Sequence, residues 1–240
     1  MKLLPFVLFV IFATFQPARA ESPKGSPASG SMADYRFNGN ARDEFPSNPP
    51  FELTNTEFRS GALYLNGKYE RNETGTGDGY HAVVRCPALD YNQFTVALRF
   101  KADDFSQNHI NLFTGGTSYR WFGMNRSEDG KLVITFNNQD YAHEVQAVPL
   151  TPGEWAVVVC GVDLPNRKVV VYFNGQKAAT ITLPAGFTLA VADSDAKEQD
   201  KRWTFTNFAD GTTFHGLVDE CIIYGKMLSD EEFARIPLKP

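Results

Sequence analysis

Acidic side chains are the residues of this sequence that could most directly carry out chemistry. They occur as adjacent pairs at Asp103-Asp104, Asp219-Glu220 and Asp230-Glu231. Glycoside hydrolysis needs two carboxyl groups on one side of a sheet, about 5 Å apart in retaining enzymes. Neighbouring residues of a strand point to opposite faces of a sheet, so an adjacent pair does not meet this requirement. The acidic pairs therefore predict no hydrolytic site.

Nucleophilic catalysis is not indicated by the other reactive residues. The four histidines are His81, His109, His143 and His215, and none of them stands in a nucleophile motif. A Gly-x-Ser-x-Gly elbow is absent as well. We expect these histidines to be hydrogen-bonded or solvent-facing, and we predict no catalytic residue. A glycoside hydrolase-like enzyme with an unrecognised site stays open as an alternative.

Aromatic residues offer a binding surface, because aromatic rings can stack against sugar faces. Tyr119 and Trp121 share one face of a short expected strand, beside the glycine-rich turn at 114–117. His109 and Asn111 fall on the preceding strand, and Trp203 is a further candidate. The sequence thus predicts a ligand site at these five residues. The alternative is that both tryptophans are core residues.

Alternation of apolar and polar residues predicts the elements that position these side chains. Phe94, Val96, Leu98 and Phe100 face inward in the clearest strand, at 92–101, and Asp129-Gly130 suits a hairpin turn. Other strands are expected at 34–38, 58–65, 110–113, 119–125, 131–137, 142–148 and within 154–180. In the closing strand, a period of two puts Leu217, Cys221 and Ile223 on one face and Val218, Ile222 and Tyr224 on the other. Ser229 and Glu232 form a capping box that begins a short helix reaching about Ile236.

The closing stretch resembles that of laminin-G-like domains, in the concanavalin-A-like lectin/glucanase superfamily. The resemblance rests on Gly216, Val218, the acidic pair, Cys221, Ile223, Tyr224, Leu228 and Ser229. Further similar stretches are Trp155 with its following strands as far as Tyr172-Phe173-Asn174-Gly175, the opening at 35–43, and 61–67. The resemblance implies an all-β jelly-roll sandwich of two antiparallel sheets, closed by a short C-terminal helical turn.

The resemblance also implies one structural calcium ion. First and last strands of a jelly roll tend to run side by side, which would bring Asp34 near Asp219, with carbonyl oxygens from the turn Asn66-Gly67. Calcium takes about six to eight oxygen ligands. The alternative is that Asp219 only accepts hydrogen bonds from backbone N–H groups.

Residues 1–20 read as a signal peptide, because Leu3 to Phe15 is apolar and Ala18-Arg19-Ala20 suits cleavage. Residues 21–33 read as a flexible Ser/Pro/Gly linker, and 34–240 as one laminin-G-like domain. We expect an exported protein that is secreted, periplasmic or at the cell surface, without membrane insertion after cleavage. The formal net charge of −5 and the lack of basic stripes argue against nucleic acid.

Three cysteines, Cys86, Cys160 and Cys221, leave at least one without a partner in the chain. We interpret them as small buried apolar residues, with a single disulfide as the alternative. Asn72 and Asn125 begin glycosylation acceptor patterns. The sequence therefore predicts a non-catalytic binding module. Carbohydrate is the ligand that the family resemblance favours, and a protein–protein or adhesion module is the first alternative.

Overall fold

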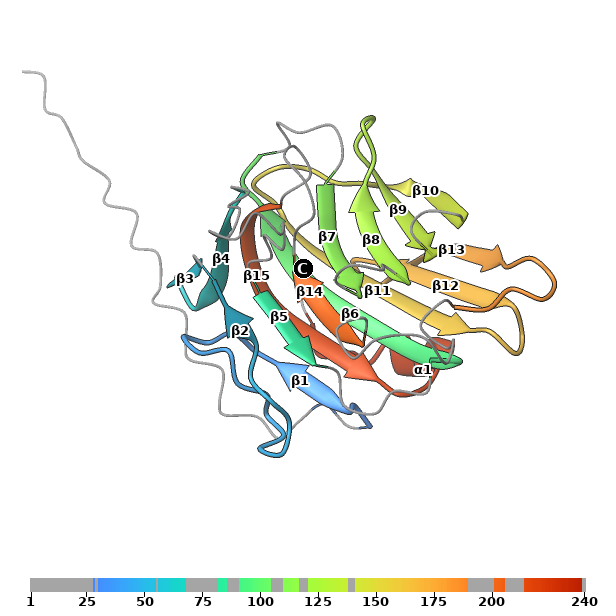
Figure 1. The fold of residues 1–240 in the computed structure, drawn as a ribbon. Coiled ribbons are helices and arrows are strands. Elements are labelled where there is room, and N and C mark those ends of the chain that lie inside the picture. The colour runs from blue at the N-terminus through green and yellow to red at the C-terminus, as the bar shows by residue number, and fades with distance from the viewer. Residues whose placement is uncertain are drawn as a thin grey trace, which may run out of the picture.

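Two antiparallel sheets follow from the alternating strands that the sequence contains. The structure, a computed structural model, describes residues 28, 30–54, 56–67, 82–85, 91–104, 110–116, 121–137, 141–189, 201–205 and 214–238. The described part of the chain forms a β-sandwich with one short helix, α1 (Asp230–Phe233) (Figure 1). The predicted all-β jelly-roll sandwich is confirmed.

Sheet A has eight strands, and its centre is the pair β6 and β15. Its order is β13 (Gln176–Thr182), β12 (Lys168–Phe173), β11 (Trp155–Asp163), β6 (Gln93–Ala102), β15 (His215–Tyr224), β4 (Ala62–Asn66) and β3 (Thr56–Arg59), and β1 (Ala33–Tyr35) also pairs with β15. The first and last strands therefore lie side by side, as predicted. Asp34 stands opposite Ile222 in this pairing.

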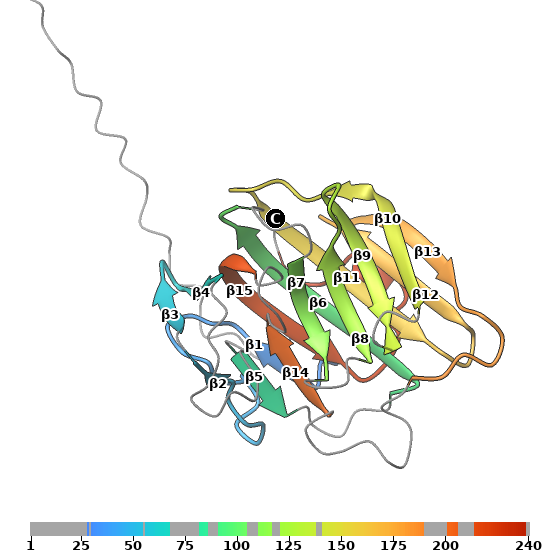
Figure 2. The same cartoon turned by 45° about the horizontal axis from the view of Figure 1, so that its top comes forward.

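Sheet B has seven strands and packs against sheet A. Its order is β10 (Tyr141–Pro149), β9 (Lys131–Phe136), β8 (Phe122–Arg126), β7 (Ile110–Gly115), β14 (Arg202–Phe205), β5 (Ala82–Arg85) and β2 (Glu52–Leu53). Figure 2 shows β7, β8 and β9 in front of β6 and β11 of sheet A. The hairpin expected around Asp129-Gly130 is the connection between β8 and β9, with Gly130 at a φ of 89°.

The main core fills the space between the sheets. Phe94, Val96, Leu98 and Phe100 of β6 point into it, as the alternation predicts. Opposing side chains come from sheet B, including Phe113, Phe122 and Phe205. Cys160 and Cys221 are buried in this core, and burial raises the pKa of the Cys160 thiol. Both match the interpretation as small apolar residues, whereas Cys86 lies outside the described residues.

A second apolar cluster lies on the outer face of sheet A. Helix α1 packs there, and the ring of Phe233 stacks on that of Tyr172 with 4.4 Å between centroids. Ser229 accepts from the Glu232 N–H and Glu232 accepts from the Ser229 N–H, so the predicted capping box is present. The helix ends at Phe233 rather than near Ile236. One half of this outer face is thereby covered by the C-terminal segment.

Two local predictions are corrected by the structure. The strand expected at 58–65 is a hairpin of β3 and β4, because Ser60 and Gly61 both take positive φ, 52° and 75°. Ala33, assigned to the linker, is the first residue of β1 and is fully buried. The proposed signal peptide lies outside the described residues. Within the part of the chain that is described, no helix is both long and apolar enough to cross a membrane.

Candidate functional site

Trp121 and Trp203 belong to the core, which corrects their prediction as a stacking surface for a ligand. Both side chains are 0% exposed, and their rings lie 4.7 Å apart between centroids. Trp203 and its neighbour Thr204 in β14 point to opposite faces of sheet B, and the Trp203 ring points between the sheets. Asn111 lies on the outer face of sheet B and is buried. Tyr119 and His109 lie outside the described residues.

The residues predicted to bind calcium do not form one site. Asp34 is bonded to Arg36, with 2.9 Å from its Oδ2 to the Arg36 Nη2, and accepts from the Ala28 N–H. Asp219 forms an ion pair with Arg99 instead. Asn66 stands opposite His215, at the other end of β15 from Ile222 and Asp34. Because arginines compensate both carboxylates, these residues do not fit the ion.

A β-bulge at Asp219 changes the faces that the closing strand presents. Val218 pairs with Phe100 and Glu220 pairs with Arg99, so Asp219 is one extra residue in β15. Val218, Cys221 and Ile223 consequently share the core face, and the predicted grouping of Leu217 with Cys221 is wrong. Asp219 and Glu220 both reach arginines on the outer face of sheet A. The prediction that this acidic pair points to opposite faces is also wrong.

Asp219 and Glu220 belong to a charged cluster with two arginines on the outer face of sheet A. The cluster lies at the edge of the apolar half of that face. We call Asp34, Arg36, Arg99, Asp219 and Glu220 the ionic cluster. Arg36 Nη1 lies 3.4 Å from Glu220 Oε1, and the Asp34 carboxylate raises the pKa of Arg36. Burial, followed by the charge of Asp219, raises the pKa of Glu220 to about 7, against the opposing effect of the arginines. The raised pKa of Glu220 lies near neutrality.

A row of side chains crosses the uncovered half of the outer face of sheet A. Cross-strand pairing aligns Trp155 of β11 with Lys101 of β6, Lys101 with Leu217 of β15, and Leu217 with Tyr64 of β4. We call these four residues the aromatic row. Trp155, Lys101 and Tyr64 are partly exposed, and Leu217 is 9% exposed. Trp155 is therefore the one tryptophan of the three that solvent reaches.

Cations lie against both rings of the aromatic row. Arg99 Cζ is 4.0 Å from the Trp155 ring centroid, and Lys101 Nζ is 5.5 Å from it. Arg59 Cζ is 3.3 Å from the Tyr64 centroid. A cation over the negative face of a ring is attracted by the ring quadrupole, which holds the ring in one orientation. Each ring therefore has a guanidinium group against it.

The Tyr64 end of the row carries a chain of hydrogen bonds. The Tyr64 hydroxyl lies 2.7 Å from His215 Nε2, and His215 Nδ1 lies 2.8 Å from Asp104 Oδ2. Asp103 Oδ2 is 3.6 Å from His215 Nε2. None of these four side chains is buried. This arrangement was not predicted, because its members come from three separate parts of the sequence.

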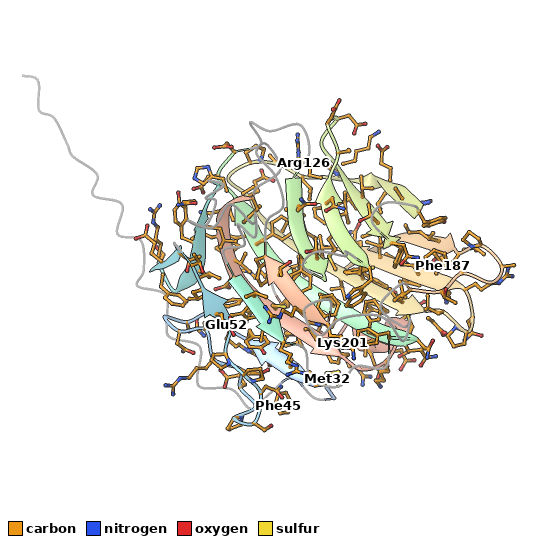
Figure 3. The ribbon with its side chains drawn as sticks, in the orientation of Figure 1. Met32, Phe45, Glu52, Arg126, Phe187 and Lys201 are labelled. Carbon is orange, nitrogen blue, oxygen red and sulfur yellow. The ribbon has the colours of Figure 1, made fainter. Side chains whose placement is uncertain are left out.

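The outer face of sheet B is built differently. One row of aligned residues runs over its whole width, from Glu52 of β2 through Val83, Thr204, Thr114, Gly123 and Thr135 to Ala142 of β10. Its middle residues are buried, whereas Glu52 at the sheet edge is exposed (Figure 3). Asn125 stands beside this row and is 4% exposed, so the glycosylation pattern at Asn125 is not accessible in the folded chain.

An open cavity of about 670 Å³ lies elsewhere, between the turn at 163–168 and the segment at 227–231. Two of its carboxylates, those of Asp163 and Asp230, accept hydrogen bonds from the protein. Asp163 accepts from Gln93 and Asn166, and Asp230 accepts from Tyr172 and Lys177. None of the residues that line this cavity is aromatic, so it offers no ring to a ligand.

Comparison with known proteins agrees with the fold. The family model described as the concanavalin A-like lectin/glucanases superfamily matches residues 74–234. Because the match spans more than half of the chain, the chain belongs to this superfamily. No curated protein matches it.

Two solved structures with a similar fold differ in how much of their own chain the match covers. Domain 4 of the extracellular arabinanase AbnA from Geobacillus stearothermophilus, solved with arabinotriose, is 20% identical with a TM-score of 0.63. The match covers 85% of this chain and 96% of that domain. Trypanosoma rangeli sialidase is 16% identical with a TM-score of 0.63 over 87% of this chain, yet the match covers only 32% of the sialidase. At these identities the likeness is one of fold.

Proposed function

We propose that this member of the concanavalin A-like lectin/glucanase superfamily is an exported carbohydrate-binding module that binds an oligosaccharide along the aromatic row. The observation that carries the proposal is the partly exposed Trp155, aligned with Tyr64 across the open half of one sheet face. Aromatic rings held at fixed positions suit the apolar faces of sugar rings, and nearby polar groups suit their hydroxyls.

The length of the row argues for more than one sugar. Trp155 and Tyr64 are separated by three strand-to-strand steps, or about 14 Å at the usual spacing. Lys101 and Leu217 lie between them and supply a donor and an apolar floor. A ligand that reaches both rings is therefore an oligosaccharide, and its monosaccharide units should bind much more weakly.

Charge favours a neutral ligand over an acidic one. Glu57, Asp103 and Asp104 lie at the Tyr64 end of the row, and the ionic cluster lies beside its middle, on β6 and β15. Carboxylates outnumber arginine and lysine side chains among these residues, and the whole chain carries a formal charge of −5. An anionic glycan would be repelled on approach. The arabinotriose held by the arabinanase domain is a neutral oligosaccharide of the size that the row suits.

The test is a glycan array probed with the full mature chain, followed by calorimetric titration of the best neutral oligosaccharide. Trp155→Ala should weaken binding about thirtyfold, since truncating an aromatic anchor typically costs about 2 kcal/mol or more. Glu52→Gln, exposed at the far edge of sheet B, is the matched control and should bind like the parent. Equal binding by Trp155→Ala and the parent would refute the site. An array without any bound glycan would favour the adhesion alternative.

A hydrolase has one observation in its favour. The bulge puts Asp219 and Glu220 on one face, and the pKa of Glu220 is raised to about 7, as a general acid requires. Against this, Asp219 is 1% exposed and ion-paired with Arg99, so a sugar does not reach it as folded. Incubation of the bound oligosaccharide with the protein should release no reducing ends. Release that disappears in Glu220→Gln would establish the enzyme instead.

A further inference from the structure

The hydrogen-bonded chain of Tyr64, His215 and Asp104 has the arrangement of an activated nucleophile, a base and a residue that orients the base. The two ring nitrogens of His215 are used separately: Nε2 faces the Tyr64 hydroxyl and Nδ1 faces the Asp104 carboxylate, at 2.7 Å and 2.8 Å. Such contacts are within the range in which a base removes a proton from a nucleophile. The chain is open to solvent, with 30% of the His215 side chain exposed.

The Asp104 carboxylate determines which of the two ring nitrogens of His215 carries the proton. An ionised carboxylate only accepts hydrogen bonds, so Nδ1 must carry the proton that it shares with Asp104. In the neutral imidazole, Nε2 is then a free lone pair, and the Tyr64 O–H donates to it. This is the tautomer in which His215 can take the phenolic proton. Without Asp104, the other tautomer would compete and would turn a donor toward Tyr64.

Charged side chains also lie against the Tyr64 ring and the His215 imidazole. The Arg59 guanidinium lies over the Tyr64 ring, 3.3 Å from its centroid, and Glu57 holds that guanidinium through an ion pair. Lys101 lies in the same face, one strand beyond Leu217. Asp103, 3.6 Å from His215 Nε2, favours the imidazolium that forms once the proton has moved. Arg59 therefore faces the negative charge that develops on Tyr64, and Asp103 faces the positive charge that develops on His215.

We propose that Tyr64 is a nucleophilic tyrosine that accepts an acyl group from an ester, with His215 as its general base and Asp104 as the residue that positions the base. Tyr64 Oη attacks the ester carbonyl carbon while His215 Nε2 takes the phenolic proton. The bond from that carbon to the ester oxygen breaks, and the alcohol leaves with the proton returned by His215. The products are O-acyl-Tyr64 and the free alcohol, without any oxidant or cofactor. This activity goes beyond carbohydrate binding.

The experiment uses 4-nitrophenyl acetate as the acyl donor and the full mature chain. Acetylation is measured tyrosine by tyrosine, by mass spectrometry of peptides, at several values of pH. Tyr141, whose hydroxyl only donates to a backbone carbonyl at 3.5 Å, serves as the internal reference. Tyr64 should be acetylated at least tenfold faster than Tyr141 at neutral pH, where an ordinary phenol is protonated. Equal rates at the two tyrosines would overturn the proposal.

Variants separate activation from mere hydrogen bonding. His215→Gln keeps a polar side chain but lacks the base, so acetylation of Tyr64 should fall about tenfold or more at pH 7 and recover only in alkaline solution. Asp104→Asn should move the pH profile of the reaction upward, while its matched control Asp103→Asn, outside the hydrogen-bonded chain, should change the profile much less. Unaltered profiles in His215→Gln and Asp104→Asn would show that the chain is only structural.

The proposal and the carbohydrate site share Tyr64, yet they fail separately. Tyr64→Phe keeps the ring for stacking and removes the nucleophilic oxygen. It should therefore abolish acetylation at this position. Absence of glycan binding in the parent, with fast acetylation of Tyr64, would refute the carbohydrate site and leave the nucleophilic tyrosine in place.

Discussion

The outer faces of the two sheets both carry polar side chains, but the polar groups and their bonding differ between the two sheets. The middle of the sheet B face uses small uncharged residues whose hydroxyls bond each other, as in the 2.5 Å contact between Thr114 and Thr204. Sheet A uses full charges, with Arg99 against Asp219 and Arg36 between Asp34 and Glu220. The middle of the sheet B face should therefore be insensitive to pH and salt, whereas the ionic cluster of sheet A should respond to both.

The contrast extends to what each face can offer a partner. The middle of the sheet B row is buried and has no aromatic ring, since Val83, Thr204, Thr114, Gly123 and Thr135 compose it. The sheet A row keeps two rings and an ammonium group partly exposed. Binding groups and costly buried charges thus occur together on sheet A. The following predictions measure how far the two faces differ.

The largest effect should come from Asp219→Ala. Removing this carboxylate leaves the buried Arg99 guanidinium without the ion pair, which typically costs about 3–5 kcal/mol. Urea denaturation at pH 7 measures the loss. The double variant Arg99→Met/Asp219→Leu, which removes both charges, should lose clearly less. A loss below about 1 kcal/mol in Asp219→Ala would mean that the charges of sheet A are no more critical than the hydroxyls of sheet B.

Glu220→Gln should change the pH dependence of stability. The folded pKa of Glu220 is about 7, raised from 4.5, so the folded protein favours its protonated form. Its contribution to stability is complete below about pH 4.5 and is lost as pH rises through 7, for a total of at most about 3 kcal/mol. The parent should therefore lose stability between pH 5 and 8 by this amount more than the variant. Parallel curves would contradict the raised pKa.

The sequence predicts the sandwich but not the sites on it. Alternation places Phe94 to Phe100 correctly, because a half-buried strand repeats every two residues. The bulge leaves no such signal: Asp219 is one extra residue, and only its partner strand reveals that Glu220 pairs with Arg99. The same holds for Trp121. A Cβ at Gly115 would lie 2.5 Å from its ring, so that glycine makes room for the indole in the core, a contact that no local pattern encodes.

Trp155, in contrast, was accessible to sequence reasoning. Ala156, Val158, Cys160 and Val162 alternate toward the core, which puts Trp155 on the outer face, at the first residue of the strand. Tyr64 was not, because its role depends on His215 and Asp104, which lie 151 and 40 positions along the chain. Regular elements are therefore predictable, and groups assembled across strands are not.

Thr114→Val should show a smaller loss that is independent of pH. Its hydroxyl bonds that of Thr204, and removing one partner from a buried pair costs about 1–2 kcal/mol. In the double variant Thr114→Val/Thr204→Val both partners are gone, so the loss should be no greater than in the single variant. A double-mutant cycle by urea denaturation at pH 5 and 8 gives the coupling. A coupling energy that differs between the two pH values would contradict the prediction that the middle of the sheet B face is insensitive to pH.

The smallest effect should come from Ser229→Ala, which tests whether the covered half of the sheet A face is independent of its open half. The substitution removes the side chain that accepts from the Glu232 N–H, and loss of such a cap typically costs about 1 kcal/mol. Helix α1 packs on Tyr172 and its apolar neighbours, whereas the aromatic row lies on the other side of the ionic cluster. The melting temperature should therefore fall while affinity for the oligosaccharide stays unchanged. A parallel loss of affinity would show that α1 and the aromatic row are coupled through the ionic cluster, so that the sheet A face acts as one unit.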